Sequence, residues 1–139
     1  MTHRFMLDTN MVSDLITNRR GMVARKIRQV GVDAVSISAV VAAELRFGYL
    51  KRASGRLKGI VEDAIGYMPV LPFTDEASVD YASIRCDLMK RGLPIGPNDL
   101  FIAAHARALD LTLVTNNIRE FSHVDGLKLE NWLEGGTDV

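Results

Sequence analysis

The chain has 139 residues, of which 47% are hydrophobic and 24% are charged, and its formal net charge is zero. This length and mixture predict one globular domain with its own core, and they exclude a disordered or collagen-like chain. The single cysteine, Cys86, excludes an intrachain disulfide and a cysteine-rich zinc module. Since the sequence contains neither an apolar run long enough to span a bilayer nor a signal peptide, we expect a cytoplasmic protein with no membrane partner.

The charges are divided unevenly along the chain. Residues 1–60 contain eleven Lys and Arg against four Asp and Glu, a difference of +7, whereas residues 61–139 contain six against thirteen, a difference of −7. The basic excess includes a cluster formed by Arg19, Arg20, Arg25 and Lys26. Such a cluster is typical both of a solvated helix face and of a surface that contacts nucleic-acid phosphates, so these four residues are candidate nucleic-acid contacts.

The hydrophobic pattern predicts strands and helices that alternate along the chain. In order, we expect a strand at 4–7, helices at 11–16 and 22–30, a strand at 32–37, helices at 39–50 and 54–67, a strand at 68–73, helices at 74–91 and 98–109, a strand at 111–115 and a short strand from 128. Ser38 and Thr74 are expected to cap helices, and Trp132 to dock the C-terminal segment on the core.

Alternation of this kind predicts a parallel sheet with helices on both faces. We therefore expect an α/β protein, a three-layer α/β/α domain with a central parallel sheet of four to five short strands. This domain is expected to span residues 1–133, and residues 134–139 are expected to form a flexible tail.

Four acidic residues occupy positions where an ordinary globular sequence seldom places them. Asp8 follows the first strand, and Glu44 interrupts an apolar helix. Asp99 lies in the first turn of the most apolar helix, and Glu120 lies just beyond the fourth strand. Three of them have a purely structural explanation: Asp8 can cap a helix, Asp99 can complement a helix dipole, and Glu44 can pair with Arg46.

Taken together, these four positions favour a shared site. The carboxyl ends of parallel strands form the ligand-binding edge of a doubly wound sheet, and Asp8 and Thr115 both end strands there. Carboxylates gathered in one crevice repel unless a cation lies between them, and a hard divalent ion such as Mg²⁺ or Mn²⁺ prefers oxygen ligands. Such an ion can activate water and neutralise charge on a phosphate, which is the chemistry of phosphodiester hydrolysis.

Four segments resemble the motifs of PIN-domain ribonucleases, specifically of the VapC toxins of bacterial toxin–antitoxin pairs. They are MLDTN at 6–10, ISAVVAAELRFG at 37–48, GPNDLFIAAHA at 96–106 and LVTNNIREF at 113–121, in family order and spacing. The resemblance covers about residues 4–133 and implies an endoribonuclease that uses Mg²⁺, for which Mn²⁺ can substitute. By this resemblance the catalytic and metal-binding residues are Asp8, Glu44, Asp99 and Glu120, supported by Asn10, Thr115, Asn116 and Asn117.

The same resemblance implies a substrate and partners. The expected substrate is a structured RNA, with a tRNA, such as the anticodon stem–loop of initiator tRNA, as the leading class, and its cleavage would arrest translation. The expected partners are a cognate VapB-type antitoxin and a second copy of the chain. Apolar residues of the helices within 39–67, Phe47 among them, are candidate contacts for either partner.

One residue departs from the pattern. Many members of the family carry an aspartate where this chain has Asn117, and Glu120, three residues later, can supply the missing carboxylate from the same helical turn. The alternative is an inactive PIN module that binds RNA or a protein partner without cutting. A haloacid-dehalogenase phosphatase is disfavoured, because it would need an aspartate where this chain has Asn10.

Overall fold

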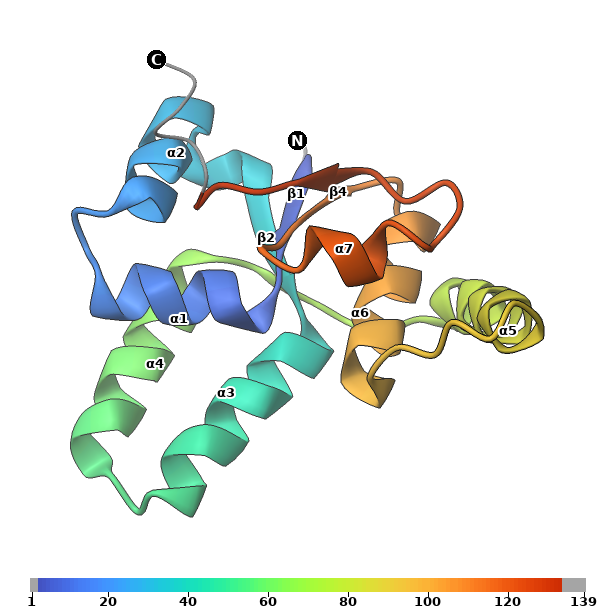
Figure 1. The fold of residues 1–139 in the computed structure, drawn as a ribbon. Helices are drawn as coiled ribbons and strands as arrows, with labels where there is room; N and C mark the ends of the chain where they lie inside the picture. Colours follow the sequence, from blue (N-terminus) through green and yellow to red (C-terminus); the bar gives the residue numbers. More distant parts are fainter. Residues whose placement is uncertain (1–2, 134–139) are drawn as a thin grey trace.

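The computed structural model describes residues 3–133, so the expected tail at 134–139 lies outside the described residues. Five strands form one sheet in the order β3-β2-β1-β4-β5, and every neighbouring pair is parallel. The strands are β1 (Phe5–Leu7), β2 (Val35–Ser38), β3 (Val70–Leu71), β4 (Thr112–Val114) and β5 (Leu129–Glu130). This sheet, flanked by helices, confirms the expected α/β class and strand number (Figure 1).

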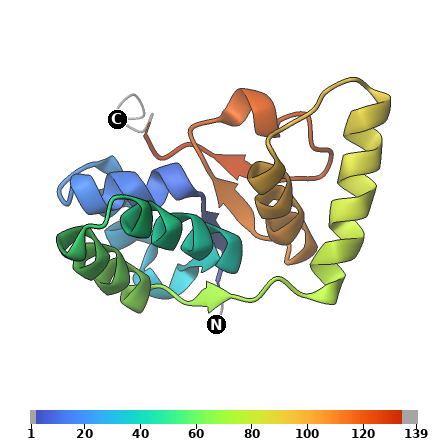
Figure 2. The same ribbon diagram turned by 90° about the horizontal axis from the view of Figure 1, so that it is seen from below.

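The helices alternate with these strands along the chain. They are α1 (Thr9–Thr17), α2 (Met22–Val30), α3 (Ala39–Lys51), α4 (Gly55–Tyr67), α5 (Asp75–Lys90), α6 (Pro97–Ala108) and α7 (Ile118–Phe121), with a 3₁₀-helix at Val32–Ala34. Helices α3 and α4 lie side by side, whereas α5 lies at the edge of the molecule, outside α6 (Figure 2). Helix α6 is buried on most of its sides, as its apolar sequence predicts.

The register of the central strand decides where the chain leaves the sheet. Leu7, the last residue of β1, lies opposite Ile37 of β2 and Val114 of β4. All three residues of β1 are buried, as expected for a parallel strand covered on both faces. Because the strands end in register, Asp8 and Thr115 emerge from neighbouring strands at the same edge.

The second strand begins later than the sequence predicts. Residues 32–34 form a 3₁₀-helix after Gly31, whose φ of 90° is one that other residues rarely adopt, and the Ala34 amide donates to the Gly31 carbonyl. Strand pairing starts only at Val35, opposite Phe5. Val32 is 45% exposed and only Ala34 is buried in this turn, so the apolar character of residues 32–34 does not by itself indicate strand pairing.

The third strand and one cap also differ from expectation. Only Val70 and Leu71 pair with β2, because Pro69 and Pro72 on either side have no amide to donate. Thr74 precedes α5 as expected, but its side chain makes no capping hydrogen bond. Ser38 does cap α3, since its hydroxyl accepts from the amide of Val40 at 3.0 Å.

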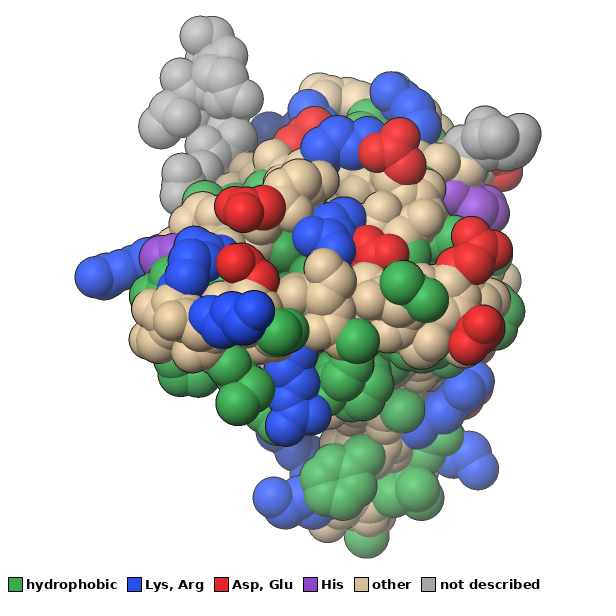
Figure 3. All heavy atoms as spheres, turned by 90° about the vertical axis from the view of Figure 1, so that its right-hand side faces the viewer, with side chains coloured by type: hydrophobic (Ala, Val, Ile, Leu, Met, Phe, Trp, Pro, Cys, Tyr) green, Lys and Arg blue, Asp and Glu red, His purple; other side chains and the backbone are tan. Residues whose placement is uncertain are grey.

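Apolar side chains remain exposed on the outer helices. Phe47 and Leu50 of α3 are 64% and 70% exposed, and Val79 and Met89 of α5 are similarly exposed. The face that includes α5 carries interspersed acidic and basic side chains, with hydrophobic side chains gathered lower down (Figure 3). Within residues 3–133, no helix combines the length and the apolar character needed to cross a membrane.

Trp132 docks the C-terminal part of the described chain, as predicted. Its ring is 3% exposed and meets Phe5 edge-on, with 5.0 Å between the ring centroids. We expect Trp132→Ala to lower the free energy of unfolding by about 3 to 5 kcal/mol, because it leaves a cavity against β1. Urea denaturation measures this loss, and Tyr67→Ala, an aromatic deletion at a 78% exposed position, serves as the control. Equal effects of the two substitutions would contradict the docking.

Candidate active site

Four separate elements bring the four predicted carboxylates to the same edge of the sheet. Asp8 stands between β1 and α1, Glu44 on α3, Asp99 in the first turn of α6 and Glu120 on α7. The charges of Asp8, Glu44 and Glu120 all raise the pKa of Asp99, so the four groups lie within electrostatic reach of one another. The structure therefore brings together the acids that the sequence singles out.

Asp8 is the most buried of these acids, with 4% of its surface exposed. Its carboxylate caps α1 by accepting from the amide of Met11 at 3.0 Å, and it also accepts from the side chain of Thr115. Burial raises the pKa of Asp8 above its ordinary value, the bonds from Thr115 and Met11 oppose this, and the charge of Glu44 adds to it. The capping role expected of Asp8 and a role in the carboxylate cluster are thus compatible.

Asp99 and Glu120 form a close carboxyl pair. Burial is the largest cause that raises the pKa of Asp99, to about 7, and a hydrogen bond and like charge from Glu120 are the next. A shared hydrogen bond between two carboxyl groups requires a proton, which the raised pKa assigns to Asp99. At neutral pH the Asp99 carboxyl is therefore close to half-protonated.

Two neutral side chains hold Glu44. The Thr9 hydroxyl donates to Oε1 at 2.5 Å, and the Asn98 amide donates to Oε2 at 2.9 Å. Neither Thr9 nor Asn98 stands among the site residues that the sequence predicts. The only sequence feature that could have indicated these two residues is their position, because Thr9 directly follows Asp8 and Asn98 directly precedes Asp99.

The predicted supporting residues surround the acids. The Thr115 hydroxyl accepts from the amide of Asn117 at 2.9 Å, and the Asn117 side chain donates to Glu120 Oε1 at 3.2 Å. The Asn10 side chain donates to that of Asn116 at 3.4 Å. Asn117 therefore orients the carboxylate that stands three residues after it.

The donor set suits a hard divalent cation, although the carboxylates do not form a ready-made coordination cage. Within residues 3–133, no three His, Cys, Asp or Glu side chains are grouped closely enough to hold a metal ion as they stand. The cluster nevertheless offers carboxylate oxygens, and the charges of Glu120, Asp8 and Glu44 add to burial in raising the pKa of Asp99. Oxygen donors and excess negative charge are what Mg²⁺ and Mn²⁺ require.

The four basic residues that were predicted to contact RNA lie apart from these carboxylates. Arg19 and Arg20 follow the C-terminal end of α1, while Asp8 caps its N-terminal end, so α1 separates them by roughly 15 Å. Arg25 and Lys26 belong to α2. Any contact that these residues make with RNA would concern a part of the molecule distant from the reacting phosphate.

The chain is similar in sequence to a known family model and to known proteins. The family model described as "PIN domain" matches residues 5–127. Ribonuclease VapC2 of Haemophilus influenzae is 35% identical over 131 residues, which cover 94% of this chain and 98% of that protein. The tRNA(fMet)-specific endonuclease VapC of Salmonella typhimurium is 35% identical over 130 residues, which cover 93% and 98%.

A solved structure shows the same fold. The crystal structure of DNA-bound VapBC from Salmonella typhimurium matches with a TM-score of 0.88 and 34% identity. The match covers 94% of this chain and 98% of the other. The likeness therefore extends over nearly the whole length of both chains.

The raised pKa of Asp99 predicts a pH-dependent effect on stability. The folded protein binds a proton at Asp99 that the unfolded chain releases, so the stabilisation present at acidic pH is lost as pH rises from about 4 to about 7. Asp99→Asn does not titrate, and we expect it to raise the free energy of unfolding at pH 8 by about 1 to 2 kcal/mol, after allowance for partial exposure.

Urea denaturation across pH 4–8 measures this difference between wild type and Asp99→Asn. Carbon-13 NMR of the Asp99 carboxyl reports its titration directly, and Glu120→Gln should shift the midpoint downward because it removes the paired charge. A midpoint near 4 in the wild type would contradict the carboxyl pair.

Proposed function

Because the chain belongs to the PIN-domain family, and within it to the VapC ribonucleases, we propose that it is a metal-dependent endoribonuclease and the toxin of a toxin–antitoxin pair. The observation that carries the proposal is the gathering of four carboxylates, in which the charges of Asp8, Glu44 and Glu120 all act on Asp99. A protein with no cation to bind gains nothing from this repulsion, which costs stability. The cluster is therefore better explained by catalysis than by folding.

Asp8, Asp99 and Glu120 are the residues that would hold Mg²⁺ or Mn²⁺ most directly, with Glu44 contributing from the side. When bound, the metal supplies an activated water and neutralises charge on the phosphate under attack. The protein's own part is orientation: Thr115 holds Asp8, and Asn117 holds Glu120. Such fixed partners keep ligands in place when a substrate enters.

Glu44 has a distinct role in this proposal. Thr9 and Asn98 already occupy both of its carboxylate oxygens, so its orientation is determined before any ligand arrives. From α3 its charge still acts on Asp8 and Asp99. We assign it to maintaining negative charge at the site and to accepting hydrogen bonds from water around the metal.

The proposed substrate is a tRNA. A relative of nearly the same length is named a tRNA(fMet)-specific endonuclease, which makes initiator tRNA the first RNA to test. Cleavage in its anticodon stem–loop would stop translation. Arg19, Arg20, Arg25 and Lys26 are proposed to contact the RNA backbone beyond the acidic edge, since phosphate contacts position RNA without reading its sequence.

The proposed protein partner is a VapB-type antitoxin. The structural relative from Salmonella typhimurium is a VapBC complex bound to DNA. A second copy of the chain is the other proposed partner, with the exposed Phe47 of α3 in the contact.

Asn117 does not favour the inactive alternative. Its side chain donates to Glu120, so an amide here orients a carboxylate on α7 rather than leaving a gap in the cluster. Glu120 is therefore the fourth acid of the cluster, beside Asp8, Glu44 and Asp99.

We expect Asp8→Asn, Glu44→Gln and Asp99→Asn each to reduce RNA cleavage at least about a hundredfold, because each removes one negative charge from the cluster. The assay incubates purified protein with initiator tRNA and with total tRNA, in Mg²⁺, Mn²⁺ or EDTA. Discrete fragments should form with either metal and vanish in EDTA.

The control is Asp110→Asn, an exposed carboxylate distant from the cluster, and it should cleave as the wild type does. Circular dichroism checks that each variant is folded. Full activity of Asp99→Asn would refute the assigned site, and wild type that neither cleaves RNA nor binds Mn²⁺ in calorimetry would favour the inactive module.

We also expect Phe47→Glu to shift the protein from dimer to monomer, because it places a charge in an apolar contact. Sedimentation velocity measures the change. The matched control is Tyr67→Glu, at an exposed aromatic residue of α4. Unchanged sedimentation of Phe47→Glu would place the dimer contact elsewhere.

A further inference from the structure

Helix α5 lies at the edge of the domain, yet it contacts both α6, which carries Asp99, and the turn that follows Glu120. It packs mainly on α6, the helix of Asp99, where Tyr81 stacks on Phe101 with 4.5 Å between ring centroids. It is also joined to residues 122–126, the turn that directly follows α7 and Glu120.

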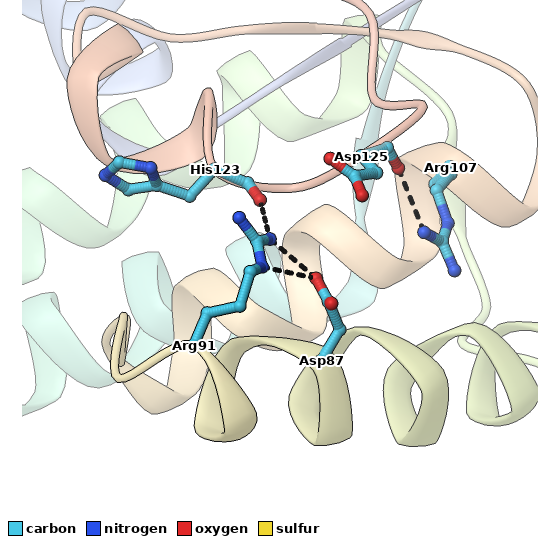
Figure 4. Close-up of polar contacts among 5 residues, drawn as sticks. All are labelled: Asp87, Arg91, Arg107, His123 and Asp125. Carbon is cyan, nitrogen blue, oxygen red and sulfur yellow. Dashed lines mark hydrogen bonds and ion pairs between the residues drawn. The ribbon is translucent and has the colours of Figure 1, made fainter.

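Two arginines connect α5 to the turn at residues 122–126 (Figure 4). Arg91, at the C-terminal end of α5, pairs with Asp87 and donates from Nη2 to the backbone carbonyl of His123 at 2.5 Å. Arg107, on α6, pairs with Asp80 at 2.7 Å and donates from Nη1 to the backbone carbonyl of Asp125 at 3.0 Å. We call this set, two α5 acids, two arginines and two carbonyls, the arginine clasp.

The turn is shaped to receive Arg107. Gly126 has a φ of +79°, and a Cβ placed there would lie 3.8 Å from Cδ of Arg107. The arginine stem therefore runs along the backbone of the turn. Each guanidinium joins a carboxylate on α5 to a carbonyl of the turn, and charge-assisted hydrogen bonds of this kind are stronger than neutral ones.

Backbone hydrogen bonds join residues 122–126 to α7. The amide of His123 donates to the carbonyl of Glu120 at 3.4 Å, and the amide of Val124 donates to that of Phe121 at 3.0 Å. Phe121 is fully buried and anchors the helix on the core. A helix of four residues has little stability of its own, so its position depends on these anchors.

We propose that Arg91 and Arg107 are positioning residues, which hold the turn after α7 so that Glu120 stays beside Asp99. The proposal rests on the proposed function only in treating that carboxyl pair as part of the active site. Neither arginine touches the reacting atoms. Arg107 is the more buried of the two, with 24% of its side chain exposed against 38% for Arg91, and its loss should have the larger effect.

The test compares Arg91→Gln, Arg107→Gln and the double variant with Arg85→Gln. Arg85 lies on α5, and within residues 3–133 its contacts of this kind are with Tyr81 alone. Hydrogen–deuterium exchange of the full-length, metal-free protein reports the amides of residues 118–124. We expect exchange there to be about tenfold faster in the double variant, with the core strands unchanged.

Two further readouts separate positioning from general stability. Calorimetric affinity for Mn²⁺ at fixed pH should fall about fivefold or more in the double variant, and kcat for RNA cleavage should fall while KM changes little. Arg85→Gln should behave as wild type throughout. Asp80→Asn, which leaves Arg107 its carbonyl contact, should give an intermediate exchange rate.

The opposite result is equally specific. Unchanged exchange at residues 118–124 and unchanged Mn²⁺ affinity in the double variant would overturn the proposal, whatever happens to the melting temperature. If the double variant does not fold, Arg107→Gln and Asp80→Asn decide by the same measurements. Since amide exchange needs neither metal nor RNA, a wild type without nuclease activity would refute the proposed function and still leave the clasp to be judged.

Discussion

The parallel pairing of β1 with both β2 and β4 is the constraint on which the rest of the structure depends. Because these strands end in register at Leu7, Ile37 and Val114, the residues that follow them meet at one edge. Asp8 and Thr115 reach each other there without any long loop. The sheet therefore creates the site by its connectivity, and α3, α6 and α7 complete it with one carboxylate each.

Neutral donors hold three of the four acids at this edge, namely Asp8, Glu44 and Glu120. Hydroxyl and amide groups of Thr9, Asn98, Thr115 and Asn117 donate to them, while the ion pairs found in residues 3–133 involve other acids. A hydrogen bond from a neutral donor orients a carboxylate but leaves its charge in place. The orientation and the negative charge needed for a cation are thus obtained together, and the cost appears as the raised pKa of Asp99.

Apolar periodicity and cap chemistry predicted several local features correctly, whereas the start of β2 and the cap at Thr74 differ from the prediction. The bounds of α2 and the cap at Ser38 follow from apolar periodicity and a hydroxyl before a helix, and both are as predicted. The segment from Val32 is apolar enough for a strand, but Gly31 turns the chain and Val35 is the first residue with a partner. Thr74 has the right chemistry for a cap and makes no capping bond.

The sequence by itself predicted the fold class and the order of the elements except the short α7, and it singled out the four acids. Strand and helix periodicity and the placement of charges beside strand ends are local properties. Only the tertiary structure decided which distant residues hold Glu44. Thr9 and Asn98 are 89 residues apart in the chain, yet both donate to Glu44. The arginine clasp likewise joins residues separated by up to 45 positions, from Asp80 to Asp125. Contacts of this range depend on how helices pack on the sheet, and no local pattern encodes them.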